Sequence, residues 1–332
     1  MENICSDNPL VSICCTTYNH ENYIHKCLKG FMMQKVDFNF EVLIYDDAST
    51  DGNKKIIQEY ADRYPGIIKP IFAKENQYSK GEKVENFNYF RAKGKYTALC
   101  EGDDYWTDPY KLQKQINALE QNSDCGICYT NIRIYDQGNE KFVPFKVNPI
   151  QGYVQTDDYI TGRIVIGTAT VVIKTELIKM TPDLDNRMYV TGDVLWMLTW
   201  LRSAKTIFID EPTAVYRVIS TSISHRKVSI RKLHLSSFRM ANTWHYLLSK
   251  YPCVDKDLQE KFLKRRKVAF LKYALMTGKP EYLPKISMKP YVSCKYTLIT
   301  ILSYFSRMAI FFPILHLLYN KYLDLKTKEY RD

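Results

Sequence analysis

Four carboxylates stand within eight residues in the segment Glu101-Gly-Asp-Asp-Tyr-Trp-Thr-Asp108. Asp103 and Asp104 follow an apolar-leaning run, 96–100, that is typical of a β-strand. Two adjacent carboxylates at a strand end repel one another unless a cation or a solvated loop neutralises them. Oxygen ligands without His or Cys suit Mg²⁺ or Mn²⁺, which proteins bind through one or two carboxylates together with substrate phosphates. The segment therefore predicts a divalent-cation site, with an ordinary Asp-rich turn as the alternative.

Several other kinds of site are disfavoured by spacing. Neither a G-x-x-x-x-G-K-[ST] loop nor a G-x-G-x-x-G motif occurs, so any phosphate must be held by another device. His20 and His25 stand five residues apart, about 140° around a helix, and cannot share one metal from one helical face. Cys125 and Cys128 lack a second cysteine pair and begin a β-like run, so a zinc or redox site is not expected there.

The elements that must position the acidic segment alternate between strand and helix over the first 130 residues. Strands are expected at 11–16, 40–45, 67–72 and 96–100, and helices at 23–33, 54–63 and 85–93. This order predicts an α/β, Rossmann-like, doubly wound and mostly parallel sheet. Ligands of such sheets bind beyond the carboxyl ends of the strands. Polar clusters occupy those positions at 17–20, 46–51 and 101–104.

After residue 140 the pattern loosens and then changes in charge. A strand at 167–173, a helix at 193–202 and a strand at 206–209 are expected. Residues 1–225 carry 25 basic and 29 acidic residues, whereas residues 226–332 carry 22 basic and 7 acidic residues. The overall charge of +11 therefore arises in the second segment. We expect a catalytic domain at 1–225 and a basic helical extension at 226–332.

Three motifs resemble those of the family 2 glycosyltransferases of GT-A fold, and the resemblance extends from residue 9 to about residue 220. They are Val11-Ser-Ile-Cys-Cys-Thr-Thr-Tyr-Asn19, Glu41-Val-Leu-Ile-Tyr-Asp-Asp-Ala-Ser-Thr-Asp51 and Glu101-Gly-Asp-Asp104. The resemblance implies an inverting enzyme that transfers a sugar from a nucleotide sugar, with UDP-sugar favoured, to a saccharide, with Mn²⁺ or Mg²⁺ as cofactor. It also implies a nucleotide-binding half at about 9–130 and an acceptor half at about 131–225.

The resemblance assigns roles to individual residues. Thr16 and Tyr18 are similar to residues that contact the nucleotide base, and Asp47 to the carboxylate that accepts the uracil N–H. Asp103 is similar to the ribose-side member of the acidic motif and is a second candidate metal ligand, while Asp104 is similar to the ligand that bridges the metal to the diphosphate. Glu101 stands where many relatives carry Asp.

Three further residues are candidates for binding or catalysis. Arg217, in a segment that resembles the family's Tyr-Arg loop, is expected to bind the diphosphate. Asp193 occupies the position of the family's catalytic base, and an N-cap of the helix that follows is its structural alternative. Lys83, with Lys80 in a glycine-containing loop, is a candidate base or phosphate contact, and a solvated charged loop is the alternative.

The residues after the acidic motif have structural alternatives as well. Tyr105, Trp106 and Tyr110 are of the type on which sugar rings pack, although packing in the core is an equal alternative. Asp108 and Pro109 fit the N-cap and the first position of a helix.

The basic extension favours an anionic membrane surface over nucleic acid, because no nucleic-acid-binding signature accompanies it. The run 296–319 is apolar, but Arg307 near its middle and Pro313 argue against a membrane span. Thr297, Thr300, Tyr304 and Arg307 would form one polar stripe, which predicts a helix lying in a membrane interface, with a core helix as the alternative. We therefore expect surface contact through 285–331.

The expected location is cytoplasmic and peripheral on the inner face of the cell membrane, since the N-terminus lacks a secretory pattern. A lipid-linked acceptor in surface polysaccharide synthesis follows as the preferred hypothesis. Three alternatives remain open: a nucleotidyltransferase, a non-catalytic sugar-binding or scaffold protein of the same fold, and a nucleic-acid-binding module that rests on charge alone.

Overall fold

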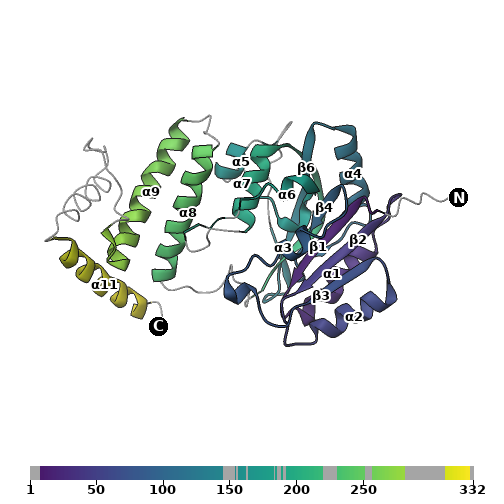
Figure 1. Ribbon diagram of the computed structural model, residues 1–332, viewed down its shortest axis with the longest axis horizontal. Coiled ribbons are helices and arrows are strands. Elements are labelled where there is room, and N and C mark those ends of the chain that lie inside the picture. Colours follow the sequence, from purple (N-terminus) through teal and green to yellow (C-terminus); the bar gives the residue numbers. More distant parts are fainter. Residues whose placement is uncertain are drawn as a thin grey trace. The chain divides into compact units, whose positions relative to one another are not determined.

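The computed structural model describes residues 8–144, 154, 156–161, 164–182, 184, 188–189, 192–219, 230–250, 256–280 and 311–329. The chain divides into two units. The first contains residues 1–182 and 192–225, and the second contains residues 183–191 and 226–332. Figure 1 shows that the first unit combines a sheet with helices, whereas the described elements of the second are helices.

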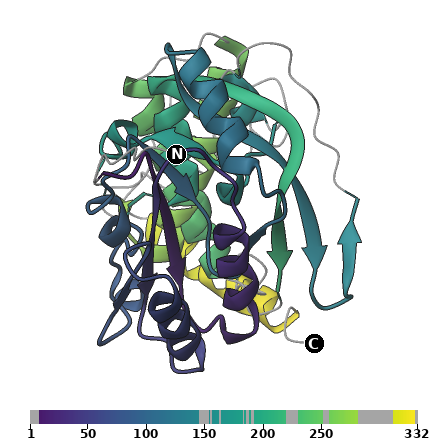
Figure 2. The same ribbon diagram turned by 90° about the vertical axis from the view of Figure 1, so that its right-hand side faces the viewer.

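The sheet of the first unit has the strand order β3-β2-β1-β4-β8-β6-β9-β5, with β7 paired to β6. β1 runs parallel to its two neighbours β2 and β4, β2 runs parallel to β3, and β6 runs parallel to β9. β8 is antiparallel to both β4 and β6, and β5 is antiparallel to β9. The strands are β1 (Val11–Thr17), β2 (Phe40–Asp46), β3 (Ile68–Phe72), β4 (Tyr96–Leu99), β5 (Tyr105–Trp106), β6 (Cys125–Asp136), β7 (Lys141–Val143), β8 (Val172–Lys174) and β9 (Lys205–Val218). Figure 2 shows these strands fanning with a twist, and the prediction of a mostly parallel α/β sheet is confirmed.

Alternating side chains of the central strands enter two separate cores, one on each face of the sheet. Ile13 and Cys15 of β1 join the core beneath α1 (Glu21–Met32), α2 (Asn53–Arg63) and α4 (Lys111–Gln121). Cys14, between them, points to the opposite core. That second core is formed with α3 (Asn86–Tyr89), α6 (Thr175–Ile178) and α7 (Asp193–Ser203). The shorter helical elements are η1 (Tyr78–Lys80), η2 (Thr168–Thr170) and α5 (Thr156–Thr161).

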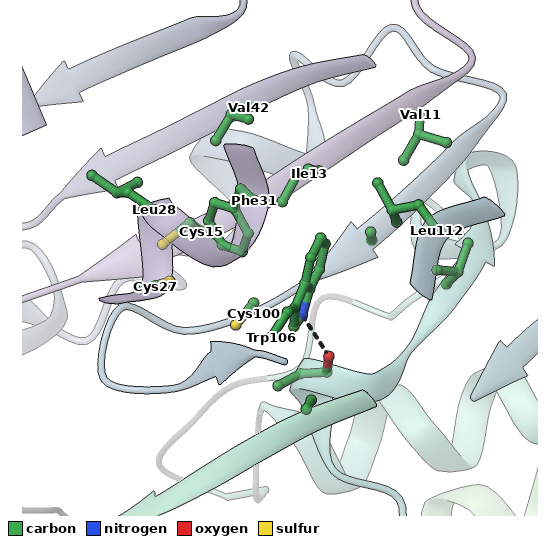
Figure 3. Packing of buried hydrophobic residues seen from close by; sticks show 14 of the residues in the cluster. Val11, Ile13, Cys15, Cys27, Leu28, Phe31, Val42, Cys100, Trp106 and Leu112 are labelled. Carbon is green, nitrogen blue, oxygen red and sulfur yellow. Dashed lines mark hydrogen bonds between the residues drawn. The ribbon is translucent and has the colours of Figure 1, made fainter. Parts of the chain in front are cut away.

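Trp106, which follows the acidic pair in the sequence, packs into the first core (Figure 3). Its ring meets Phe31 edge to face, with centroids 4.8 Å apart, and its Nε1–H donates to the carbonyl of Ala169 at 2.8 Å. Trp106 is therefore a core residue, and the alternative of core packing is the one that the structure supports.

Several boundaries differ from the sequence-based expectation. The helix expected at 85–93 is the single turn α3, and the strand expected at 167–173 is η2 followed by β8. β9 continues well beyond 209, because Pro212 is accommodated at a register shift opposite Asn131. α4 begins at Lys111 rather than after Asp108, whose Oδ1 instead accepts the N–H of Tyr110 at 2.8 Å.

The second unit contains three described helices, α8 (Ile230–Lys250), α9 (Lys256–Thr277) and α11 (Phe311–Glu329). Pro313 lies in the first turn of α11, where its missing N–H leaves no helical hydrogen bond unmade. The predicted polar stripe at 297–307 lies outside the described residues. Within the described parts of the chain, no helix is both long enough and apolar enough to cross a membrane.

Candidate active site

The polar segments that follow β1, β2 and β4 are joined by backbone hydrogen bonds at the carboxyl edge of the sheet. The N–H of Gly102 donates to the carbonyl of Thr16 at 3.0 Å, and the N–H of Asp47 donates to the carbonyl of Thr17 at 3.0 Å. The loop after β1 is therefore fixed between the other two. The three motifs recognised in the sequence lie together, as the carboxyl ends of neighbouring parallel strands must.

Asp46 holds the second loop in a closed conformation. Its Oδ1 accepts the N–H of Ser49 at 2.9 Å, and its Oδ2 accepts the amide of Asn53 at 2.6 Å. Ala48 has φ of +61°, a left-handed conformation that costs a non-glycine residue about 1 kcal/mol or more. The loop is thus held in a defined, mildly strained shape by hydrogen bonds from its own side chains.

Asp47, the predicted uracil acceptor, organises the segment that carries the lysine candidates. Its two carboxylate oxygens accept the N–H groups of Gln77 and Tyr78 at 2.7 and 3.0 Å, and the carboxylate is buried. Lys80 forms an ion pair with Glu75 at the surface, and Lys83 follows in the loop between η1 and α3. The structure thereby places Lys83 in the segment anchored by Asp47.

Thr16 and Tyr18, the predicted base contacts, lie on either side of a buried threonine at the end of β1. Thr16 is half-buried, while the Tyr18 side chain is 43% exposed. Asn19 follows with φ of +54°, and its Oδ1 accepts the N–H of Thr50 in the neighbouring loop at 2.8 Å. An exposed aromatic ring beside two ordered loops is a surface on which a nucleotide base can stack.

The three carboxylates of the acidic turn differ in environment. Asp103 is half-buried, whereas Asp104 is only 4% exposed. Burial, with a further contribution from the charge of Asp103, raises the pKa of Glu101 to about 8. Burial, Asp103 and Glu101 together raise the pKa of Asp104 well above its usual range. Ionisation of Glu101 and Asp104 is therefore unfavourable unless a cation binds beside them.

Arg217 clamps this turn from β9. The guanidinium Nε donates to the carbonyl of Asp103 at 2.8 Å and Nη1 donates to Gln137 Oε1 at 2.8 Å, while the backbone N–H donates to Asp104 Oδ1 at 2.8 Å. The guanidinium also lies 4.9 Å from the ring centroids of both Tyr23 and Tyr105. Arg217 is 6% exposed and lies in a strand rather than in the expected loop, so its visible role is to hold the acidic turn.

The acidic turn fits a divalent cation that binds together with a phosphate ligand. Within the described ranges, no three His, Cys, Asp or Glu side chains are arranged to hold an ion by themselves. Mg²⁺ and similar ions commonly use only one or two protein carboxylates and complete their coordination with water and substrate phosphates. Asp103 and Asp104 are carboxylates of the required type at adjacent positions, and a bound cation would stabilise the ionised form of Asp104.

Asp193 is placed at the first turn of α7 by a glycine. Gly192 has φ of +100° and ψ of −153°, a conformation essentially restricted to glycine, and its carbonyl accepts the N–H of Trp196 at 3.0 Å. Asp193 is the first residue of α7 and is exposed, so the expected N-cap position belongs to Gly192. Its charge contributes to the raised pKa of Glu101, which indicates that the two carboxylates lie near each other.

Two residues near the acidic turn, Glu85 and His20, were not predicted from the sequence to belong to the site. Burial raises the pKa of Glu85, at the start of α3, and the charges of Asp193 and Asp47 raise it further. His20 Nδ1 lies 3.2 Å from Thr17 Oγ1, and Nε2 lies 3.9 Å from Asp103 Oδ2. Burial lowers the pKa of His20. The position of His20 directly after the first motif could have indicated that it belongs to the site. For Glu85, only the fold shows that the side chain lies near the acidic turn.

The remaining aromatic candidates differ in exposure. Tyr105 is buried, and Lys26 Nζ lies 3.9 Å from its ring centroid. Tyr110, at the N-cap of α4, is exposed. Cys125 and Cys128 are both buried in β6.

Comparisons with known proteins agree with this arrangement. Residues 12–175 match the model of Glycosyl transferase family 2. An uncharacterized protein of Mycobacterium tuberculosis is 44% identical over 129 residues, which cover 39% of this chain and 37% of that protein. The match thus spans little more than a third of the length of this relative. The Bacillus subtilis protein "Putative teichuronic acid biosynthesis glycosyltransferase TuaG" is 29% identical over 243 residues, covering 72% of this chain and 91% of that protein.

Two solved structures share the fold at low sequence identity. The crystal structure of S. aureus TarS 1-349 in complex with UDP-GlcNAc superposes with a TM-score of 0.57 at 17% identity, covering 89% of this chain and 80% of that chain. The mannosyltransferase PcManGT from Pyrobaculum calidifontis, in complex with GDP-Man and Mn²⁺, gives a TM-score of 0.51 at 15% identity, covering 98% of this chain and 82% of that chain. The three motifs and the match over residues 12–175 assign this segment, just under half of the chain, to glycosyl transferase family 2, and its sheet shares the fold of the two solved structures.

Proposed function

We propose that the protein is an inverting glycosyltransferase that moves a sugar from a UDP-sugar to a saccharide acceptor. The observation that carries the proposal is the cluster of carboxylates in the acidic turn, located at the carboxyl edge of the sheet with Asp193 near Glu101. A nucleoside diphosphate bound with a divalent cation would place a positive charge beside these carboxylates. The UDP-GlcNAc complex of TarS and the GDP-Man and Mn²⁺ complex of PcManGT support this donor class.

The donor is bound by the three ordered loops. Tyr18 stacks on the base, and the Asp47 carboxylate, already aligned by two backbone N–H groups, accepts the uracil N–H. Asp103 and Asp104 face the ribose and diphosphate side, with Arg217 holding their turn in place. Lys83 approaches the base or the phosphates. When bound, Mn²⁺ or Mg²⁺ supplies Lewis-acid stabilisation of the charge that develops on the diphosphate.

Asp193 carries the proton transfer. Its carboxylate takes the proton of the acceptor hydroxyl, whose oxygen forms a bond to the anomeric carbon from the face opposite the leaving group. The bond from that carbon to the UDP oxygen breaks, and the bonding electrons leave with UDP. One displacement inverts the configuration of the anomeric carbon. Asp193 lies in the first turn of α7, where its carboxylate stands at the positive end of the helix dipole.

The acceptor is proposed to be a lipid-linked saccharide used in surface polysaccharide synthesis, at the inner face of the cell membrane. The similarity to TuaG, whose name refers to teichuronic acid biosynthesis, supports a polysaccharide product. The net charge of +15 in residues 226–332 supports a nearby anionic surface.

A donor screen tests the proposal. UDP-, GDP- and dTDP-sugars are compared with Mn²⁺ and Mg²⁺ for thermal stabilisation, since a ligand that binds the folded state raises apparent stability. Asp193→Asn should retain donor stabilisation and lower sugar turnover by about 10²–10⁴-fold. Asp62→Asn, an exposed carboxylate change in α2, is the control and should behave as wild type. Donor binding without turnover in the wild type would support the non-catalytic alternative, and full activity of Asp193→Asn would refute the assignment of the base.

A further inference from the structure

Helix α11 has one face that the second unit covers. Phe312 and Leu323 are buried, and the core formed with Leu271 and Leu275 of α9 includes Phe312. The hydroxyl of Tyr319 lies 2.7 Å from His234 Nε2 of α8. These contacts fix the rotation of α11 about its axis, and therefore which of its side chains point away from α8 and α9.

The opposite face of α11 is apolar and exposed. Ile314, Leu317, Leu318 and Tyr322 are exposed on this face. At 100° per residue they fall within an arc of about 140° around the helix axis, opposite Phe312 and Leu323. Lys321 lies within the same arc and is also exposed. The apolar members of this surface are Ile314, Leu317, Leu318 and Tyr322, with 51%, 70%, 59% and 47% of their side chains exposed. We call these four residues the α11 outer face.

The net charge of the sequence segment that contains α11 indicates which kind of surface covers the α11 outer face. Residues 226–332 carry 22 basic and 7 acidic residues, and no acidic residue occurs between Glu281 and Asp324. A second copy of the chain would bring two surfaces with a net positive charge together, whereas an anionic lipid surface complements that charge. An exposed apolar face that also carries a lysine is typical of a helix that lies in a membrane interface.

We propose that the α11 outer face inserts into the interface of an anionic membrane, with Leu317 and Leu318 at its centre. The Lys321 side chain extends along the apolar surface and places its ammonium group among the lipid phosphates. The four apolar side chains leave water without the helix crossing the bilayer. The proposal deepens the proposed function and rests on it only for the statement that a lipid-linked acceptor lies nearby.

Vesicle binding by the full chain tests whether the α11 outer face inserts into an anionic membrane. Flotation is measured with neutral phosphatidylcholine vesicles and with vesicles that also contain phosphatidylglycerol, in the absence of nucleotide. Wild type should bind the anionic vesicles and lose binding as salt rises, because surface charges are screened. The double variant Leu317→Glu with Leu318→Glu should lose at least about tenfold in vesicle affinity, or about 1.4 kcal/mol, because two apolar side chains would no longer leave water on binding.

A matched double variant provides the control. Val165 and Met180 are also exposed apolar residues, at 50% and 55%, and replacing both with Glu should leave vesicle binding unchanged. Because Leu317 and Leu318 lie outside the core, the Glu variants should keep the wild-type unfolding midpoint. Unchanged binding of the Leu317 and Leu318 variant would overturn the proposal. A wild-type dimer that the same variant converts to a monomer would also overturn it, by showing that a second copy covers the face.

The vesicle test can succeed even if the proposed glycosyltransferase function is wrong, so the two failures can be told apart. Vesicle binding is measured without donor or acceptor, so an inactive protein can still pass this test. Turnover of a water-soluble acceptor should be equal in wild type and in the Leu317 and Leu318 variant, because neither residue belongs to the catalytic site. A loss of that turnover with intact folding would contradict a purely membrane-binding role for the α11 outer face.

Discussion

Replacing Arg217 with methionine separates two roles for this residue. As a diphosphate ligand, Arg217 would contribute to donor affinity and little to folding. As the clamp seen in the structure, it contributes to both, because its guanidinium hydrogen-bonds the carbonyl of Asp103 and the side chain of Gln137. Methionine keeps an unbranched side chain near Tyr23 and Tyr105, although a shorter one, and removes every side-chain donor.

The expected loss of stability follows from the contacts. Two hydrogen bonds from a charged donor contribute about 1.5–3 kcal/mol each, or about 3–6 kcal/mol together. The loss of the two cation–π contacts adds about 0.5–1 kcal/mol each. Part of this lost stability is recovered, because the variant no longer pays the desolvation cost of a buried guanidinium. We expect the free energy of unfolding to fall by about 3 kcal/mol, a large fraction of the 5–15 kcal/mol typical of a domain.

Urea unfolding followed by tryptophan fluorescence measures this change, and UDP titration of the folded variant measures donor affinity. Arg133→Met is the control, since Arg133 is exposed and its guanidinium lies 3.7 Å from the ring centroid of Phe142. The control should change the free energy of unfolding by less than about 1 kcal/mol. An Arg217→Met protein as stable as wild type, with donor affinity lost, would refute the clamp and favour the diphosphate ligand.

Two further predictions concern pH. The pKa of Glu101 is raised to about 8, so the folded state holds its proton more tightly than the unfolded state, and stability falls as pH rises from about 4.5 to 8. Glu101→Gln should reduce this fall, measured as urea midpoints between pH 5 and 9 without divalent ions; an unchanged slope would contradict the raised pKa. Burial lowers the pKa of Lys111 to about 7, so the unfolded state binds the extra proton and stability rises between about pH 7 and 10.4. Lys111→Met should flatten that rise in the same measurement, and an undiminished rise would show that Lys111 is charged in the folded protein.

The strands at the site edge were predictable because their sequences leave few alternatives. β1 and β2 are apolar, β-branched runs followed at once by polar residues, and they were located to within one residue. The acidic turn followed from the same reasoning. The predicted strand at 206–209 ends before Pro212, a residue that normally ends a strand. In the structure, β9 continues past Pro212 because its register with β6 shifts at that point.

The contacts within the site were less predictable, because they join distant parts of the chain. The hydrogen bond from the Arg217 N–H to Asp104 spans 113 residues, and no local pattern reports it. The proximity of Glu85 to Asp193 likewise depends on α3 and α7 covering the same face of the sheet. Asp47 was predicted as a ligand from its motif, whereas its two backbone partners follow from the path of residues 76–78.

Gly30 joins α1 to the strand that follows the acidic turn. A Cβ at this position would lie 3.0 Å from both the backbone N and O of Trp106, so a larger residue would require α1 and β5 to move apart by a few tenths of an ångström. α1 also carries Tyr23 and Lys26, which contact the side chains of Arg217 and Tyr105. The helix is thus linked to the strand after the acidic turn and, through Arg217, to the turn itself. On the proposed function, the donor would meet an ordered wall there, and its binding would cost little conformational entropy.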